Sequence, residues 1–452
     1  MMTFIFTLSA LALLTFVTLQ GWKKASQDEN LNSRPVYYAV YFLLNSLLPM
    51  LLIASLWLVA ESFVYKPIVL STFTDEQGIV EQAELRFLEV TQIAAGKIEH
   101  TQNDLLDKAV NAYQEAQEVT NWVLSLMVLV VGFITWRLSH KKYNKGFNAR
   151  ESVEKIIKML LAASSAVAVL TTLGIVLSLL FETLRFFQHV PFFDFIFGTH
   201  WSPQTALRAD QAGSSGSFGL IPLLSGTLLI ALIAMIIAIP VGLYSAIYLA
   251  EYASPNTRKI MKPALEILAG IPTVVYGFFA ALTVAPLIVE WSTIIGLEAS
   301  SENALAAGIV MGAMIIPFIS SLSEDVISSV PQGLRDGSLA LGATKAETIK
   351  NVVLPAALPG IVSSVLLGFS RAVGETMIVV MAAGLAANLS ANLLDSVTTI
   401  TAQIVTILVG DQSFDSPKTL AAFALGLTLF TVTLTLNFIA LRIVQKYKEQ
   451  YE

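Results

Sequence analysis

Arg371 is a charged residue in a stretch that otherwise has the character of a membrane span. It lies in the run LLGFSRAVGETMIVVMAAG, and Glu375 follows four residues later, one helical turn away on the same face. About eleven residues at ~1.5 Å each separate Arg371 from Gly360, which puts the guanidinium close to the membrane midplane. Placing such a group in hydrocarbon costs at least about 2.5–3.5 kcal/mol, so it must face protein, water or a ligand.

Two interpretations of this pair are open. In one, Arg371 and Glu375 form an intrahelical ion pair that only neutralises itself. In the other, the guanidinium lines a route for an anion, and Glu375 orients it or balances its charge. Arginine suits a tetrahedral oxyanion because its planar donor fork binds two oxygens at once. Since a buried ion pair is weak evidence for stability, we favour the second interpretation, in which one arginine serves transit rather than tight capture.

The composition predicts an all-α polytopic membrane protein. Of the 452 residues, 55% are hydrophobic and only 13% are charged, which is too apolar for a soluble enzyme. The net charge of −6, without a basic tract, argues against nucleic acid as a partner. The chain has no cysteine, which excludes disulfides and thiol catalysis, and its four histidines are too scattered to predict a metal site.

Nine apolar runs are long enough to cross a bilayer. They are 3–20, 37–60, 122–138, 156–181, 218–250, 265–290, 303–330, 356–384 and 418–443. Lys and Arg are concentrated in alternate loops, which places those loops and the C-terminus in the cytoplasm and the N-terminus outside. Lysines follow the run 3–20 rather than precede it, so we expect a retained span and not a cleaved signal peptide.

The spans predict an organisation in three parts. Residues 1–150 form an N-terminal extension with about three spans and an acidic helical segment, 61–121, outside the membrane. That segment is either a solvated spacer, which we favour, or a docking site. Residues 156–217 supply the first core span and an external connection, whose Gly/Ser run suits a flexible link. Residues 218–445 supply the rest of the core, in which Gly270 and Pro272 predict a broken helix.

A cytoplasmic loop at 331–360 interrupts this core. Its sequence predicts two short helices separated at Gly342. The second helix has an apolar face of Ala346, Ile349 and Val353, and we expect Pro355 to end it. A short amphipathic element attached to a span at each end is suited to receiving force from a partner outside the bilayer.

The loop resembles the EAA-type coupling loop of bacterial ABC importer permeases. Asp336-Gly337-Ser338 stands where that family has Glu-Ala-Ala, Gly342 is in register, and Val352, Leu354 and Pro355 follow at the family's spacing. The runs ILAGIPTVVYGF, LALGATKAETIKNVVLPAALPGI and SRAVGETMIV resemble the phosphate-specific permeases. The ending FALGLTLFTVTLTLNFIALRIV is more similar to the PstC-type than to the PstA-type chain of the pair. The resemblance covers about 156–452.

This resemblance implies a type I ABC importer permease core of six spans, here preceded by about three extra helices. It implies a permease subunit that moves inorganic phosphate across the bacterial inner membrane, with a PstA-like second permease, a homodimeric nucleotide-binding ATPase, a periplasmic phosphate-binding protein and the surrounding lipid as partners. The implied contacts with the ATPase are Asp336, Gly342, Ala343, Glu347, Leu354 and Pro355. Thr273 and Tyr276 join Arg371 and Glu375 as pathway candidates, because a hydroxyl is able to bond phosphate, although it is equally able to bond the backbone.

The chain itself is expected to be neither an enzyme nor a cofactor-binding protein. It has no GxxxxGK[ST] run, so ATP and Mg²⁺ would be bound by the partner ATPase. Another oxyanion importer, for sulfate or molybdate, is an alternative that Arg371 would suit equally. An ion-coupled secondary transporter is a second alternative, although we see no clear inverted repeat. A membrane scaffold or sensor is a third, in which Arg371 would be only structural.

Overall fold

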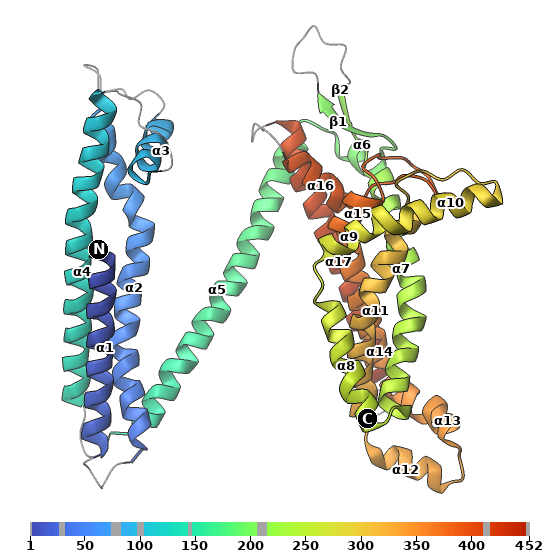
Figure 1. The fold of residues 1–452 in the computed structure, drawn as a ribbon, viewed down its shortest axis with the longest axis horizontal. Coiled ribbons are helices and arrows are strands. Elements are labelled where there is room, and N and C mark those ends of the chain that lie inside the picture. The colour runs from blue at the N-terminus through green and yellow to red at the C-terminus, as the bar shows by residue number, and fades with distance from the viewer. Residues whose placement is uncertain are drawn as a thin grey trace. The chain divides into compact units, whose positions relative to one another are not determined.

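The computed structural model describes residues 2–26, 32–73, 83–96, 104–142, 147–205, 215–409 and 416–448. The chain divides into two compact units, Met1–Leu170 and Thr171–Glu452 (Figure 1). Within the described residues, eight helices are long and apolar enough to cross a membrane. The predicted class, an all-α polytopic membrane protein, is therefore confirmed.

The first unit is a helical bundle. Its helices are α1 (Met2–Ser26), α2 (Pro35–Leu70), α3 (Ala83–Ala94), α4 (Asp104–Lys142) and the first part of α5 (Ala149–Phe186). Helix α2 packs against both α1 and α4. The C-terminal part of α2 and the N-terminal part of α4 extend beyond their apolar stretches. Helix α3 packs on both of them, and Tyr65, Val90 and Tyr113 are buried in the shared core. The predicted span 3–20 lies in α1, which is not among the eight spans.

The predicted segment 61–121 is helical wherever the structure describes it, apart from short turns. It contains the end of α2, all of α3 and the start of α4. Helix α3 ends at Ala94, and Gly96 has φ 69° in the turn that follows. Residues 74–82 and 97–103 of this segment lie outside the described residues.

The second unit contains the remaining elements. They are α6 (Phe192–Phe197), β1 (Trp201–Thr205), β2 (Ser215–Phe218), α7 (Ile221–Ile247), η1 (Tyr248–Tyr252), α8 (Pro255–Ala269), α9 (Thr273–Phe279), η2 (Ala280–Val284), α10 (Ala285–Ile295), α11 (Ala304–Ser329), α12 (Gln332–Ala340), α13 (Lys345–Thr348), η3 (Ile349–Val353), α14 (Leu354–Val373), α15 (Met377–Ala382), α16 (Ile400–Leu408) and α17 (Pro417–Lys448), where η denotes a π-helical turn. Helices α12 and α13 lie at one end of this unit and the two strands at the other (Figure 1).

Helices α7 and α11 form the centre of the second unit. They approach closely because small residues lie on their shared face. A Cβ on Gly308 would lie 2.5 Å from Cγ2 of Ile233, and one on Gly312 would lie 2.9 Å from the carbonyl oxygen of Ala234. Helices α14 and α15 complete this core, which buries Ile315, Ile319 and Ile378 completely.

Two of the predicted spans are each divided at a glycine, and the division at Gly374 was not predicted. The run 265–290 is not one helix: α8 ends at Ala269, Gly270–Pro272 is irregular, and the membrane-spanning helix runs from Thr273 to Ile295. The run 356–384 divides at Gly374, which separates α14 from α15. The break at Gly270–Pro272 was predicted, and its reason is that Pro272 has no N–H to donate and keeps Ile271 out of the helical region.

The prediction that Pro355 ends a helix is also wrong. The π-helical turn η3 leads directly into α14, in which Pro355 occupies the first turn. A proline at that position is tolerated because the wider turn before it leaves room for the ring and needs no hydrogen bond from its nitrogen. The helix therefore continues from Lys345 to Val373.

The connection 182–217 contains a short hairpin that the sequence did not predict. Strands β1 and β2 are antiparallel, with Trp201 opposite Phe218. The Nε1–H of Trp201 donates to Oε1 of buried Gln403 over 3.0 Å, which anchors the hairpin on α16. Of the predicted Gly/Ser link, residues 215–217 belong to β2, and 206–214 lie outside the described residues.

An irregular stretch between α15 and α16 passes directly over α7. A Cβ on Gly226 would lie only 2.1 Å from the carbonyl oxygen of Thr398. One residue further along α7, the hydroxyl of Thr227 accepts from the backbone N–H of Ile400 over 3.1 Å. The sequence of α7 is therefore constrained to have no side chain at 226.

We predict that Gly226→Ala lowers the free energy of unfolding by about 1–3 kcal/mol, the usual cost of overpacking a tight core. Thermal unfolding of the purified protein in detergent measures this loss. Gly174→Ala is the matched control, since nothing lies within 4 Å of a Cβ at that helical glycine. Equal unfolding temperatures for the two variants would contradict the prediction.

Candidate functional site

Arg371 lies in the last turn of α14, and its side chain is exposed on this chain. Its guanidinium carbon lies 5.6 Å from the ring centroid of Phe318 on α11, which is a cation–π arrangement. A guanidinium held over an aromatic face keeps its in-plane N–H donors available. The arginine is therefore positioned by α11 and has donors available for an anion.

Glu375 does not share a helical turn with Arg371, so that part of the prediction is wrong. Helix α14 ends at Val373, and Gly374 forms its C-cap by donating to the carbonyl of Ser370 over 3.2 Å. Glu375 instead caps α15, where its Oε1 accepts from the N–H of Met377 over 3.0 Å. The ion pairs found among the described residues do not include one between Arg371 and Glu375. The break at Gly374 explains this, because it removes the helical geometry on which an i, i+4 pair depends.

Thr273 and Tyr276 lie just beyond the break that follows α8. Thr273 is the first residue of α9. The hydroxyl of Tyr276 donates to the carbonyl of Leu268 over 2.9 Å, so it bridges the break and satisfies the exposed end of α8. Helix α9 packs on α15, and a Cβ on Gly277 would lie 3.2 Å from the carbonyl of Met377. The hydroxyl of Tyr276 therefore bonds the backbone, which was one of its two expected roles, the other being a bond to phosphate.

A cluster of charges joins α8 to α11 near the end that carries α12. Glu324 is only 1% exposed, and its carboxylate accepts from the guanidinium of Arg258 and, over 2.6 Å, from Nζ of Lys262. Lys262 also bonds Oδ1 of Asp325 over 2.7 Å, and Arg258 bonds the hydroxyl of Ser328 over 2.9 Å. The hydrogen bonds to Asp325 and then to Glu324 raise the pKa of Lys262, so its ammonium stays charged at neutral pH.

Glu324 and Asp325 were not predicted as site residues, since the prediction rested on Lys and Arg within the spans. Glu324 lies near the end of the predicted span 303–330, in the run SSLSEDVISS, and Asp325 follows it. A buried carboxylate needs cations or hydrogen-bond donors around it. An acidic residue inside a span therefore indicates a paired or functional site as strongly as a basic residue does. That signal was present in the sequence.

The coupling segment, residues 331–360, folds as two helices about Gly342, as predicted. Gly342 has φ 89°, a left-handed conformation that favours glycine. Asp336 is exposed on α12 and accepts from the side-chain amide of Gln332 over 3.1 Å. Glu347 forms a capping box with Thr344 at the start of α13, and each side chain accepts from the other's backbone N–H.

The other predicted coupling residues lie around the start of α14. Ala343 is half-buried between the two helices, and Leu354 and Pro355 open α14 after the π-helical turn. Leu354 packs at the edge of a core formed by α7, α11 and α14, which contains Ile327 and Val353. These residues therefore fix the angle at which the coupling segment joins the core.

Arg335 holds the coupling segment on the core. Arg335 of α12 donates to Oε1 of Glu251 on η1 over 2.8 Å, and to the carbonyl of Ile327 at the end of α11 over 2.8 Å. The hydroxyls of Ser338 and Thr348 lie 2.9 Å apart and join α12 to α13. Arg335 was expected only as a basic loop residue. Its partner Glu251 lies 84 positions away in the sequence, and no local pattern indicates the pair.

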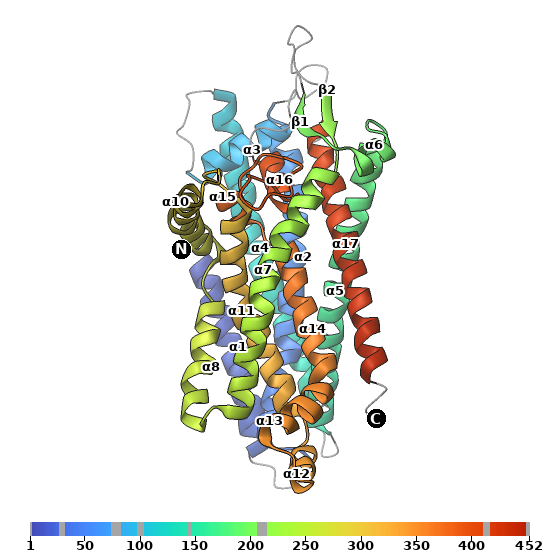
Figure 2. The ribbon, with the colours of Figure 1, turned by 90° about the vertical axis from the view of Figure 1, so that its right-hand side faces the viewer.

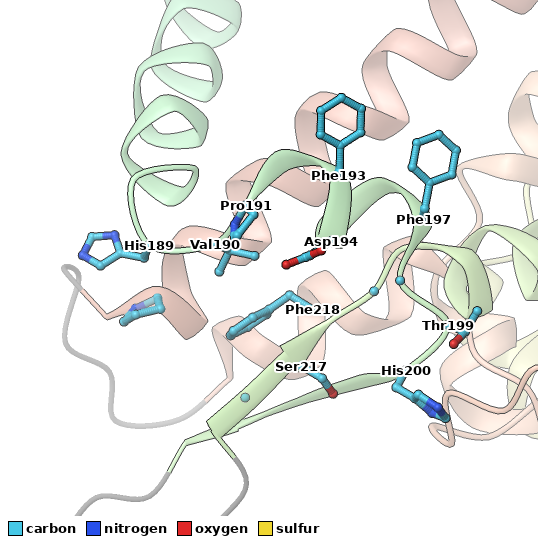
Figure 3. Close-up of a pocket in the computed structure, with 14 residues that line it drawn as sticks. His189, Val190, Pro191, Phe193, Asp194, Phe197, Thr199, His200, Ser217 and Phe218 are labelled. Atoms are coloured by element: carbon cyan, nitrogen blue, oxygen red, sulfur yellow. The ribbon is translucent and has the colours of Figure 1, made fainter.

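A hollow of about 610 Å³ lies between α6 and the hairpin, and none of the predicted site residues lines it. Its polar lining includes His189, Asp194 and His200. Figure 3 shows Phe193 and Phe197 projecting on the opposite side of α6 from Ser217. Among the described residues, no group of three or more His, Asp or Glu side chains is placed to hold a metal ion. The aromatic run RFFQHVPFFDFIFGTHW, residues 185–201, supplies these three polar side chains.

Comparison with known proteins assigns both parts of the chain. Residues 238–449 match the family described as binding-protein-dependent transport system inner membrane component. Residues 5–171 match a family described as phosphate ATP-binding cassette transporter. The N-terminal extension is thus part of a described family and not an isolated addition.

Individual relatives agree with these families. The chain is 32% identical to the phosphate transport system permease protein PstC of Xylella fastidiosa, over 64% of this chain and 91% of that protein. It is 34% identical to the probable ABC transporter permease protein YqgH of Bacillus subtilis, over 51% of this chain and 72% of that protein. A solved bacterial alginate ABC transporter matches with 17% identity and a TM-score of 0.45, covering 65% of this chain and 97% of that one. Because 32% identity extends over 91% of the Xylella fastidiosa PstC protein, the chain belongs to the PstC-type family of ABC transporter permeases.

Proposed function

We propose that this chain is the permease subunit of an ATP-driven importer that carries inorganic phosphate into the cytoplasm across the bacterial inner membrane. The observation that carries this proposal is an unbroken helical path. Helix α13, the turn η3 and helix α14 run continuously from Lys345 to Val373, and Arg371 lies in the last turn. Displacement of the coupling segment therefore moves the guanidinium directly.

The coupling segment has the surface of a docking element. Leu341, at the turn between α12 and α13, is 91% exposed, and Leu334 and Leu339 are about half exposed. Exposed leucines on a short helical element suit a groove on a partner protein. In our proposal that partner is a homodimeric nucleotide-binding ATPase, which binds ATP and Mg²⁺ and hydrolyses ATP. This chain itself performs no hydrolysis.

The exposure of Arg371 supports a second chain in the membrane. An exposed guanidinium at the depth of a span does not stay in contact with lipid, since hydrocarbon gives it no hydrogen bonds. We therefore propose that a PstA-like permease covers this face and supplies the other wall of the pathway. Arg371 takes the oxygens of phosphate, while Glu375 lies at the adjacent helix break and balances charge. Thr273 and Tyr276 are secondary lining residues at the second break.

The proposal also fixes the orientation. Residues 331–360 and the C-terminus lie in the cytoplasm, and the N-terminus and residues 61–121 in the periplasm, since basic residues are concentrated in the first set of loops. A periplasmic phosphate-binding protein delivers substrate at the end that carries β1 and β2. This orientation places the docking element on the side where ATP is available.

Sulfate or molybdate import is the rival proposal, because one arginine fork suits any tetrahedral oxyanion. The match of residues 5–171 to a phosphate transporter family favours phosphate. A secondary transporter would have no use for the coupling segment, and a scaffold or sensor would have no use for an exposed guanidinium within a span. Co-purification of a nucleotide-binding ATPase with this chain would count against both.

We predict that Arg371→Gln lowers phosphate uptake roughly 10- to 100-fold, since a charge-assisted hydrogen bond contributes about 1.5–3 kcal/mol. Uptake of labelled phosphate in phosphate-starved cells measures this, with complex assembly checked by co-purification. Arg442→Gln is the matched control, because Arg442 also lies over a phenylalanine ring, at 4.9 Å from Phe438, but at the far end of α17. Normal uptake by Arg371→Gln would make the arginine structural. Full competition by excess sulfate would remove phosphate as the specific substrate.

We predict that Gly342→Ala uncouples ATP hydrolysis from uptake, because alanine at φ 89° is strained by about 1–3 kcal/mol and the angle between α12 and α13 must change. The ratio of ATP hydrolysed to phosphate transported in proteoliposomes should rise. Gly337→Ala, inside α12 with nothing within 4 Å of its Cβ, should leave this ratio unchanged. An unchanged ratio in both variants would show that the turn has no part in coupling.

A further inference from the structure

Helix α8 is attached to the second unit differently from its neighbours. None of its residues is buried, whereas α7, α11 and α14 each bury a row of side chains. Its side chains reach α11 through Arg258 and Lys262, which meet Glu324, Asp325 and Ser328. The attachment of α8 to α11 is therefore mainly ionic, and ionic contacts exchange partners more readily than an interdigitated apolar face does.

Helix α8 has a segment that departs from α-helical geometry at each end, where the backbone is able to bend. The helix follows the π-helical turn η1 and begins at Pro255, and it ends at the irregular residues Gly270–Pro272. Glu251, within η1, is the residue that Arg335 of the coupling segment holds over 2.8 Å. Movement of α12 is therefore passed to the start of α8 by an ion pair, separately from the helical path through α14.

The ionic contact of α8 lies on the same stripe of α11 as the arginine site. Phe318, Leu322 and Asp325 are spaced at i, i+4 and i+7, so they lie along one face of α11. Arg371 lies over the ring of Phe318, and Lys262 bonds Asp325. Seven residues separate these two positions, about 10 Å along the helix axis. Helices α8 and α14 both pack against α11 (Figure 2). This row of residues therefore forms the surface of α11 between them.

We infer that Glu324 is a positioning residue for transport. Its buried carboxylate holds α8 against α11, and α8 in this position closes the anion pathway on the cytoplasmic side of Arg371. When α12 moves, Arg335 displaces Glu251 just before α8. Helix α8 then rotates about Gly270–Pro272, and Arg258 and Lys262 separate from Glu324 and Asp325. The two released cations then line the exit of the anion. This inference rests on the proposed transport function and adds a gate to it.

The test uses the natural absence of cysteine in the chain, which removes background labelling. In one variant, Arg258→Cys and Ser328→Cys are joined by a short bifunctional maleimide, which fixes α8 to α11. In the control, Ser328→Cys alone, at an exposed position of α11, is treated with the same reagent, which modifies α11 without joining it to α8. Both are assembled with the ATPase, the second permease and the phosphate-binding protein in proteoliposomes, and each is compared before and after treatment with the reagent.

We expect the α8 cross-link to lower phosphate uptake about tenfold or more, while the reagent leaves uptake by the single variant within about twofold, because only the cross-link fixes α8. An equal loss of uptake in the two variants, or normal uptake with α8 fixed, would overturn the inference. Absence of phosphate uptake by the wild-type complex would instead overturn the proposed function.

Glu324→Gln gives a second readout. We expect it to raise the ATP hydrolysed per phosphate transported, because α8 is no longer held between cycles, and we expect Glu324→Asp to restore much of the coupling. A purely structural glutamate would lower assembly and leave that ratio unchanged in the complexes that form. That result would contradict the positioning role.

Discussion

A backbone that crosses hydrocarbon must satisfy its own hydrogen bonds, and the helix breaks of the second unit are matched by side chains that meet this demand. The break after α8 is bridged by the hydroxyl of Tyr276, and the break after α14 by the carboxylate of Glu375. The hydroxyl of Thr401 donates to the carbonyl of Glu375 over 2.8 Å, and the amide of Gln403 donates to that of Leu385 over 2.9 Å. These helices end where such hydrogen-bonding partners are present. One of the breaks directly follows α14, the helix in which Arg371 lies.

The same unit combines two kinds of attachment. Helices α7 and α11 are joined through glycines and fully buried aliphatic side chains, which resist sliding because any shift opens voids. The coupling segment and α8 are joined through ion pairs and hydroxyls at the edge of that core. A transporter needs both kinds, since a pathway must keep its shape while the elements that open it move. The division between them follows the sequence: small and aliphatic residues in the centre, and charged residues near the end that carries α12.

The sequence predicted the class, the coupling segment and the break at Gly270–Pro272, because each depends on local signals: apolar length, a left-handed glycine and a proline. It failed where a contact joins distant residues. The pairing of Arg335 with Glu251 and the anchoring of Trp201 on Gln403 span 84 and 202 positions. Glu375 was misplaced because the pattern of α14 was continued through Gly374, although a glycine followed by Glu-Thr is also a stop and a new helix cap. The roles of the pathway residues remain predictions, since they depend on a transported anion and a second chain.

The π-helical turn η3 has a mechanical consequence for the path from the coupling segment to Arg371. A π-helical turn contains one more residue than the α-helical turn it replaces. If η3 took up α-helical geometry, the helix beyond it would shift by about 1.5 Å along its axis and rotate by about 100°. Because α14 continues from η3 without interruption, that rotation would reach Arg371 undiminished and turn its side chain toward a different face. A transition of η3 between the two geometries would therefore turn Arg371 in a discrete step, as a change of register.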